Sequence, residues 1–391
     1  MTETADQIFV LLKYWLVAFA PAKWQPFFSM LISAAAIVGG FAGLFALTTI
    51  LERKGLGRIQ NRYGPNRVGP FGLLQPLADG VKSLTKEDIV PRSADQIVHF
   101  IAPLVLVGPV FLALAVIPMG RNLVAAELDA GVLFFLAAGA ATELSVFMAG
   151  WSSRNKYSML GAMRAIAQMI SYEVPLILSA VTVVMTAGSL STVTIVEAQS
   201  GYTGALPNWY VLTPWGLAGF VLFLIAALAE SNRSPFDLPE GESEIIAGYY
   251  IEYSGFKFAL FFLGEYIGMF AISGMAVTLF LGGWHAPFDF LGWVPSYLWF
   301  FGKLFALICL FIWIRGTLPR LRMDQLMNFA WKFMVPLTLM NIVVAGFWRF
   351  MQPGFARWVA CGVLIAAPAA ILAHLLFAKG KIQKRVYRYA D

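Results

Sequence analysis

The chain is divided into apolar stretches of about 20 residues, the length that an α-helix needs to cross a lipid bilayer. Hydrophobic residues make up 59% of the 391 positions and charged residues only 13%, which is more apolar surface than a water-soluble domain of this length buries. The sequence therefore predicts an all-α polytopic membrane protein, a single membrane domain over 1–391 with about nine transmembrane helices. The predicted spans lie near 27–51, 97–117, 131–150, 170–190, 213–230, 258–281, 297–314, 331–350 and 357–377.

Positive charge alternates between successive loops, as expected when basic loops stay in the cytoplasm. The loops after the odd-numbered spans and the C-terminal tail hold 22 of the 28 Lys and Arg residues, when Lys332 at the edge of the eighth span is counted with its loop. We therefore expect the N-terminus to face outward, and the C-terminus and loops 52–96 and 231–257 to face the cytoplasm. Residues 8–20 are too short to span and are predicted to form an interfacial helix. Membrane topology also accounts for the net charge of +6, so no nucleic-acid partner is expected.

Neither the cysteines nor the histidines are spaced to hold a metal or a redox centre. Cys309 and Cys361 stand alone in apolar runs, and His99, His285 and His374 are scattered. Zinc, iron–sulfur and disulfide patterns all need cysteines or histidines grouped at characteristic spacings. We therefore expect no bound metal and no covalent cofactor.

The first long loop combines basic residues with turn formers. Lys54, Arg58 and Arg62 are four residues apart, so a helix here would carry a cationic stripe that attracts anions. The glycines and prolines of 64–70 predict rigid turns, and an amphipathic helix bearing Asp79 is expected after them. Ordinary cytoplasmic loop charge beside a surface helix is the alternative interpretation.

A second loop places many carboxylates beside the membrane. Its acidic residues are Glu230, Asp237, Glu240, Glu242, Glu244 and Glu252. If the stretch after Pro239 is helical, several of them share one face, where repulsion between like charges would raise pKa values and let protons be held near neutral pH. We interpret the loop as part of a proton relay. A solvated acidic loop, with Arg233 as a local counter-ion, is the alternative.

Three further glutamates lie within predicted spans. Glu143 falls in the third span, Glu173 at the start of the fourth and Glu265 in the sixth. Charged groups are costly in hydrocarbon and generally turn toward partners, water or an ion path, so a functional role is the default prediction. Lys303, near the outer end of the seventh span, is a candidate partner for them, and snorkelling to the surface is its alternative role.

Six motifs stand out over roughly residues 27–350. They are Glu52-Arg53-Lys54, Gly64-Pro65-Asn66, Gly69-Pro70-Phe71-Gly72-Leu73-Leu74-Gln75-Pro76, Ile170-Ser171-Tyr172-Glu173-Val174, the stretch from Ala229 to Glu244, and Leu263-Gly264-Glu265-Tyr266. These motifs are long and far more specific than a lone glycine pattern. Together they resemble the H-subunit family of NADH–quinone oxidoreductase (respiratory complex I), a family that includes the mitochondrial NADH dehydrogenase subunit 1.

The resemblance implies a membrane subunit of a proton-pumping NADH:quinone oxidoreductase in the bacterial inner membrane. Such a subunit joins the hydrophilic and membrane arms, forms much of the cavity through which quinone enters, and begins the carboxylate chain that couples quinone reduction to proton translocation. Quinone is the implied substrate, and flavin and iron–sulfur clusters belong to partner subunits. The implied partners are the hydrophilic quinone-site and iron–sulfur subunits, neighbouring membrane-arm subunits and membrane lipid.

The resemblance also implies roles for individual residues. The quinone path is expected to include Glu52, Arg53, Arg62, Asp79 and Arg233. The proton relay is expected to include Glu173, Glu230, Asp237, Glu240, Glu242, Glu244, Glu252 and Glu265. Glu143 joins the relay on the strength of its burial in a span. The N-terminal segment and the ninth span extend beyond the mitochondrial pattern, and no role is predicted for them.

Three other functions fit parts of the sequence. A related membrane subunit of a hydrogenase or another ion-pumping oxidoreductase would share the fold but take electrons from a different donor. A stand-alone secondary transporter would also bury carboxylates in a helical bundle, although no internal repeat is found. A purely structural anchor would leave the buried glutamates without a purpose.

Overall fold

The computed structural model describes residues 6–204, 206–238 and 247–377. Helices dominate these residues, and two-residue strands β1 (Tyr202–Thr203) and β2 (Leu206–Pro207) form one antiparallel pair. The α-helices are α2 (Ile8–Ala18), α3 (Gln25–Ile59), α4 (Gln75–Thr85), α5 (Gln96–Ala115), α6 (Gly131–Ser152), α7 (Lys156–Ala187), α8 (Thr192–Glu197), α9 (Pro214–Glu230), α11 (Gly255–Phe280), α12 (Ser296–Thr317), α13 (Met323–Phe329), α14 (Val335–Phe350) and α15 (Phe355–Phe377). Shorter helical turns are η1 (Ala22–Trp24), η2 (Pro70–Gly72), η3 (Tyr210–Leu212), η4 (Gly248–Tyr250), η5 (Asp289–Leu291) and the π-helix η6 (Ala330–Met334).

Eight helical stretches among the described residues are long and apolar enough to cross a membrane. They comprise α3, α5, α6, α7, α11, α12, the continuous run from α13 to α14, and α15. The chain is thus an all-α polytopic integral membrane protein, as the sequence predicts. Helix α9, with 17 residues, and α2, with 11, are shorter, so a ninth crossing at 213–230 and an interfacial role for 8–20 stay predictions.

Two helices extend past the apolar windows that predicted them. Helix α3 continues to Ile59, so the first part of loop 52–96 is helical. Helix α7 begins at Lys156, where the Asn155 side chain accepts a hydrogen bond from the Tyr157 amide and caps the helix. Glu173 therefore lies in the middle of α7 and not at its start. Hydropathy ends a window at the first polar residues, whereas a helix continues while its backbone and caps are satisfied.

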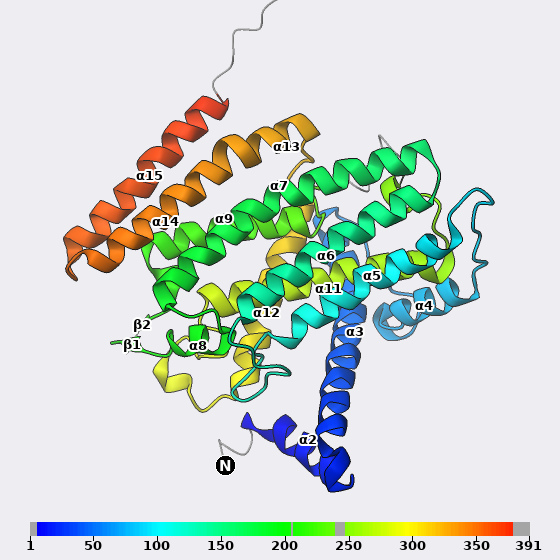
Figure 1. The fold of residues 1–391 in the computed structure, drawn as a ribbon, viewed down its shortest axis with the longest axis horizontal. Coiled ribbons are helices and arrows are strands. Elements are labelled where there is room, and N and C mark those ends of the chain that lie inside the picture. Colours follow the sequence, from blue (N-terminus) through cyan, green and yellow to red (C-terminus); the bar gives the residue numbers. More distant parts are fainter. Residues whose placement is uncertain (1–5, 205, 239–246, 378–391) are drawn as a thin grey trace, which may run out of the picture.

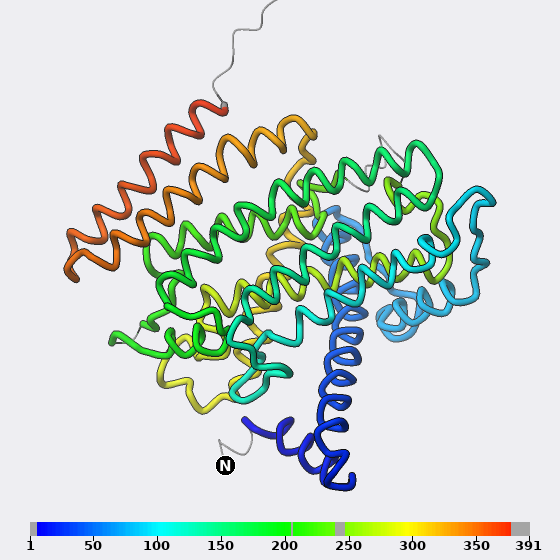
Figure 2. The backbone as a smooth tube through the Cα atoms, viewed as in Figure 1, coloured from blue at the N-terminus to red at the C-terminus, as the bar shows by residue number. Residues whose placement is uncertain are grey.

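Helix α11 forms the core of the bundle, because 72% of its apolar window is buried, more than in any other candidate span among the described residues. Helices α3, α5, α9 and α12 pack against it, and α7 packs against α6, α9 and α14. In Figure 1, α14 and α15 lie side by side at one edge of the molecule. Figure 2 follows the chain from α2 into α3, whose first half projects away from the bundle.

A half-buried lysine binds the backbone at the C-terminal end of α11. Lys303 Nζ donates hydrogen bonds to the carbonyl oxygens of Leu281, Gly283 and His285 at 2.7, 2.9 and 2.7 Å. The same ammonium lies 4.0 Å from the centroid of the Trp209 ring. Lys303 therefore neutralises the partial negative charge at a helix C-terminus. The predicted pairing of Lys303 with a buried glutamate is wrong, because these carbonyls need donors and lie closer to it.

Close backbone packing between α7 and η4 gives the first prediction. A Cβ added at Gly161 would stand 2.7 Å from the carbonyl carbon of Gly248. Gly161→Ala should therefore destabilise the fold by about 1–3 kcal/mol, because two backbones must separate. The measurement is the melting temperature of the purified protein, with Gly108→Ala as control, since nothing lies within 4 Å of a Cβ added at Gly108. Equal melting temperatures for the two variants would contradict this close approach.

The segment between α11 and α12 gives a pH prediction. Burial, together with the charges of Lys303 and Arg121, lowers the pKa of His285 from 6.5 to about 4. Because the unfolded chain binds this proton more readily, stability is lost as pH falls from about 6.5 toward about 4. Thermal melts from pH 7 to pH 4 should show a smaller acid loss in His285→Gln than in the wild type. If the melting temperatures of the variant and the wild type fall in parallel with pH, His285 does not contribute to the loss of stability in acid.

Candidate functional site

The first part of the site is a buried carboxylate held between two arginines. Glu52, near the C-terminal end of α3, is 3% exposed, and its Oε2 accepts a 2.7 Å bond from Arg233 Nη1. Its Oε1 is paired with Arg315 at the end of α12. The Tyr266 hydroxyl donates to Oε2 at 2.8 Å, and the Arg233 guanidinium lies 4.2 Å from the Tyr266 ring centroid. We call Glu52, Arg233, Tyr266 and Arg315 the arginine cluster.

The arginine cluster joins parts of the chain that are far apart in sequence. Arg233 pairs with Glu52, which is 181 residues away. The cluster carries one negative and two positive charges, so it has a net charge of +1 in a poorly solvated place. Such a cluster attracts anionic or strongly polarised oxygen atoms.

Helix α4 is tied to the end of α3 beside this cluster. Arg53 Nη1 lies 2.5 Å from Asp79 Oδ2, and Lys54 Nζ donates to the Phe71 carbonyl. Both ends of the Arg53–Asp79 pair are substantially exposed. The predicted amphipathic helix is thus present and is fixed to α3 by polar contacts.

Arg62 lies apart from these contacts. Helix α3 ends at Ile59, so the helix carries Lys54 and Arg58 but not Arg62, and the predicted stripe of three is shortened. The Arg62 amide bonds to the Gly57 carbonyl, and its Nε donates to Gln60 Oε1 at 2.7 Å. An exposed turn therefore holds Arg62, and a place on the quinone path stays a prediction for it.

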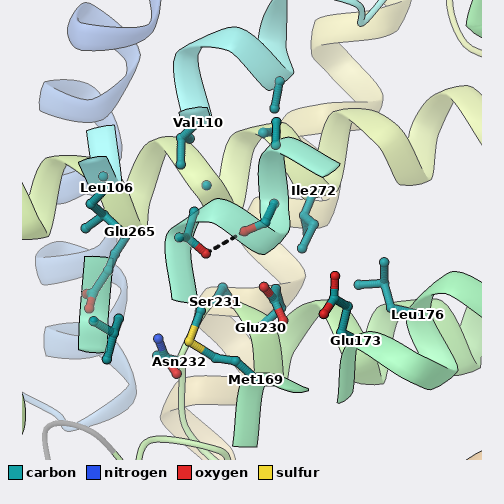
Figure 3. Close-up of a pocket in the computed structure, with 18 of the residues that line it drawn as sticks. Leu106, Val110, Met169, Glu173, Leu176, Glu230, Ser231, Asn232, Glu265 and Ile272 are labelled. Atoms are coloured by element: carbon teal, nitrogen blue, oxygen red, sulfur yellow. Dashed lines mark hydrogen bonds between the residues drawn. The ribbon is translucent and has the colours of Figure 1, made fainter. Parts of the chain in front are cut away.

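The second part of the site is a partly open cavity of about 80 Å³ between α5, α6, α7, the end of α9 and α11. Three carboxylates line it, those of Glu173, Glu230 and Glu265 (Figure 3). The remaining lining is mostly apolar, including Leu106, Val110 and Ile272. A cavity of this size has room for several water molecules, and its carboxylates can bind them. We call it the carboxylate cavity.

A fourth glutamate lies next to the cavity. Glu143, on α6, is close to Glu173, on α7, which lines the cavity. Two ionised carboxylates offer acceptors only, so a hydrogen bond between these two side chains needs one proton. Glu230, at the end of α9, interacts electrostatically with both. The structure thus brings together three glutamates that the sequence places on three different helices.

Glu265 and Glu252 lie on the side of the cavity nearer η4. Glu265, on α11, accepts a 3.0 Å hydrogen bond from the Tyr249 hydroxyl. Glu252 follows η4 in a turn, where its Oε1 accepts from Asn155 Nδ2 at 2.6 Å. Next to it, burial raises the pKa of Tyr253 to about 12, so this phenol keeps its proton at neutral pH.

The loop after α9 connects the two parts of the site. Gln168 Nε2, on α7, donates to the carbonyls of Ala229 and Phe236 at 2.7 Å each, which pins both ends of the segment carrying Glu230 and Arg233. Asp237 is half-buried just after it. The predicted relay residues Glu240, Glu242 and Glu244 lie outside the described residues.

Sequence reasoning missed three residues of the site. Arg315 was counted only as topological charge at the end of a span, and Tyr266 was seen only within a motif. Gln168 was not singled out, although a buried amide in an apolar run signals a polar partner. Among residues 6–204, 206–238 and 247–377, no group of three or more His, Cys, Asp or Glu side chains is arranged to hold a metal ion.

Comparison with known proteins shows the family of this chain. The NADH dehydrogenase family matches residues 32–346, most of the chain. The chain belongs to this family. The family therefore covers both parts of the site, from Glu52 on α3 to Arg315 on α12.

Relatives within the family share nearly half of the sequence. The H subunit of NADH-quinone oxidoreductase from Dehalococcoides mccartyi strain CBDB1 is 49% identical over 344 residues, covering 88% of this chain and 93% of the relative. The H subunit from Polaromonas naphthalenivorans strain CJ2 is 44% identical over 347 residues, with 86% and 95% covered. The H subunit from Bacillus mycoides strain KBAB4 is 46% identical over 324 residues, with 83% and 95% covered.

The geometry of the arginine cluster predicts that two arginine variants of this chain differ greatly in stability. Arg233→Ala should cost about 3–5 kcal/mol, because it leaves Glu52 with one buried cation fewer. Arg53→Ala, which removes an exposed pair, should cost only about 0–1 kcal/mol. The measurement is the melting temperature and the amount of folded chain recovered from membranes. Equal losses would mean that Arg233 and Glu52 are not paired in a solvent-excluded place.

Proposed function

We propose that this chain is the membrane subunit of a proton-translocating NADH:quinone oxidoreductase that links the hydrophilic arm to the membrane arm. The observation that carries the proposal is the joining of the arginine cluster and the carboxylate cavity by the segment from Glu230 to Arg233. Membership of the NADH dehydrogenase family, and relatives that are H subunits of NADH-quinone oxidoreductase, support the same assignment.

Quinone approaches along the end of α3 and α4 in this proposal. The arginine cluster and the Arg53–Asp79 pair supply charged and hydrogen-bonding groups next to exposed apolar residues such as Leu77 and Val81. A quinone has an apolar tail and two carbonyl oxygens that become more negative on reduction. Such oxygens favour a site of net positive charge.

The carboxylate cavity begins the proton path. Glu143 and Glu173 hold one proton between them, and Glu230 and Glu265 offer further acceptor groups on the same cavity. Asp237, Glu240, Glu242, Glu244 and Glu252 extend this path as proposed members on the cytoplasmic loop. Proton transfer between such groups proceeds through water molecules that the cavity can hold.

The two parts are coupled through charge. Quinone reduction consumes protons and changes the charge next to the arginine cluster. Arg233 is three residues from Glu230, and Tyr266 follows Glu265 directly, so a change in field or position at one part reaches the other over a short distance. The carboxylates then shift protons, and partner subunits carry the signal onward.

Electrons reach the quinone from partner subunits that hold flavin and iron–sulfur clusters. The other proposed partners are the hydrophilic quinone-site subunit and neighbouring membrane-arm subunits. The bacterial inner membrane is the proposed location, with the N-terminus outside and the C-terminus in the cytoplasm. This topology is supported by the meeting of Glu52, Arg233 and Arg315, which come from the ends of three spans predicted to finish on the same side.

Replacing one relay residue tests the proposal. Glu173→Gln keeps the shape and hydrogen-bonding capacity of the side chain but removes its titratable proton. The complex should assemble. Proton pumping coupled to NADH-dependent quinone reduction should fall by up to roughly a hundredfold, which is typical when a positioned proton-transfer group is removed. The measurements are NADH oxidation and proton uptake by vesicles containing the complex.

The matched control is Glu197→Gln, an exposed glutamate at the end of α8. It should leave both rates unchanged. If Glu173→Gln also pumps and turns over like the wild type, Glu173 is not part of the relay.

A further inference from the structure

A large apolar groove is lined in part by Pro235 and Phe236, which follow the segment from Glu230 to Arg233. It has a volume of about 660 Å³, within the range of small-molecule binding cavities. Its walls come from α9, the segment after α12, α13, η6 and the C-terminal end of α15. Its apolar lining includes Ile225, Leu318, Phe329 and Leu375. We call this the α9–α15 groove.

One cation and one amide interrupt the apolar lining. Lys332 lines the α9–α15 groove and is exposed. Among the residues that the structure describes, no acidic side chain forms an ion pair with its ammonium group. Lys332 lies in the π-helix η6, an irregularity that occurs often at functional sites. Gln325 also lines the groove, and its Oε1 accepts from the Arg322 amide, which leaves its Nε2 group as a donor. Both groups are suited to bind a phosphate oxygen.

The surrounding sequence is also basic. Between Leu318 and Lys332 there are three basic residues and one acidic residue, Asp324. The chain that follows Phe377 carries five Lys and Arg residues over 378–391 and one acidic residue. That composition makes the chain's own C-terminus a poor filler for an apolar groove, while it favours an anionic ligand nearby.

We infer that the α9–α15 groove binds one acyl chain of an anionic phospholipid, with the headgroup phosphate at Lys332 and Gln325. The setting is a membrane, where acyl chains are the most abundant apolar ligand. Helix α15 borders the groove and has only 6% of its apolar window buried, so lipid can reach the groove. An acyl chain fits the depth of the groove, and an anionic headgroup matches the charge at its rim.

The bound chain would support the loop that connects the two parts of the site. Pro235 and Phe236 line the groove, and the Pro235 carbonyl accepts a 3.0 Å bond from the amide of Leu321, which lines it as well. On its other face, Phe236 contacts the Tyr172 ring at a centroid distance of 5.2 Å, one residue from Glu173. The lipid is therefore a structural ligand of the segment that holds Arg233. This inference depends only on the membrane setting and stands apart from the proposed function.

Photo-labelling tests the inference on the chain purified from membranes with its partner subunits. The protein is placed in nanodiscs that contain phosphatidylglycerol with a diazirine on one acyl chain, irradiated, and mapped by peptide mass spectrometry. Label is expected on peptides containing Ile225, Phe329 or Leu375. Lys332→Gln should lower this labelling by about fivefold, the effect of one basic residue on an anionic lipid. Leu318→Trp, which narrows the groove, should also lower it.

Control measurements separate the alternatives. Lys23→Gln, an exposed lysine at the far end of the chain, should label like the wild type, and native gels verify that each variant assembles. Equal labelling by a neutral diazirine phosphatidylcholine, with no effect of Lys332→Gln, would overturn the inference. Displacement of the lipid label by a diazirine-bearing isoprenoid quinone would overturn it too, and would assign the groove to a quinone tail. Absence of label from all groove peptides would exclude a lipid chain there.

Discussion

The buried ion pair between Glu52 and Arg233 is the interaction on which the rest of the site depends. A carboxylate that is 3% exposed is tolerated only when cations and hydrogen bonds replace the water it has lost. Arg233, Arg315 and Tyr266 provide that replacement, and they come from the loop after α9, from α12 and from α11. Satisfying one charge therefore fixes four separate parts of the chain against one another.

Helix α11 shows how one element can serve two polar sites without mixing them. Successive helical residues point about 100° apart, so Glu265 faces the carboxylate cavity while Tyr266 faces the arginine cluster. The apolar remainder of α11 is buried among neighbouring helices and is anchored at its far end by Lys303. A charge change at either site acts on the same rigid helix, which makes α11 the shortest physical link between them.

The fold and the chemistry of the site could be predicted to different extents. Apolar windows predicted helices at nearly the right positions, because hydrophobic length is a direct requirement of the bilayer. The same logic placed Glu143 within a span, and in the structure it is half-buried in α6 close to Glu173. The partners of individual charges could not be predicted. Lys303, a candidate partner for the glutamates, binds backbone carbonyls instead, because a local sequence does not say which distant carbonyl or carboxylate will meet a given charge.

The sequence by itself determined that the chain is a helical membrane protein, that its charges gather at helix ends and loops, and that several carboxylates must sit in costly places. Those properties depend on composition and spacing, which a linear pattern contains. Only the tertiary structure decided that Glu52 binds arginines 181 and 263 residues away, and that three glutamates from different helices share one cavity. The physical reason is that helix packing sets the distances between these side chains. Once they are removed from water, each charged or polar group must be satisfied by its neighbours.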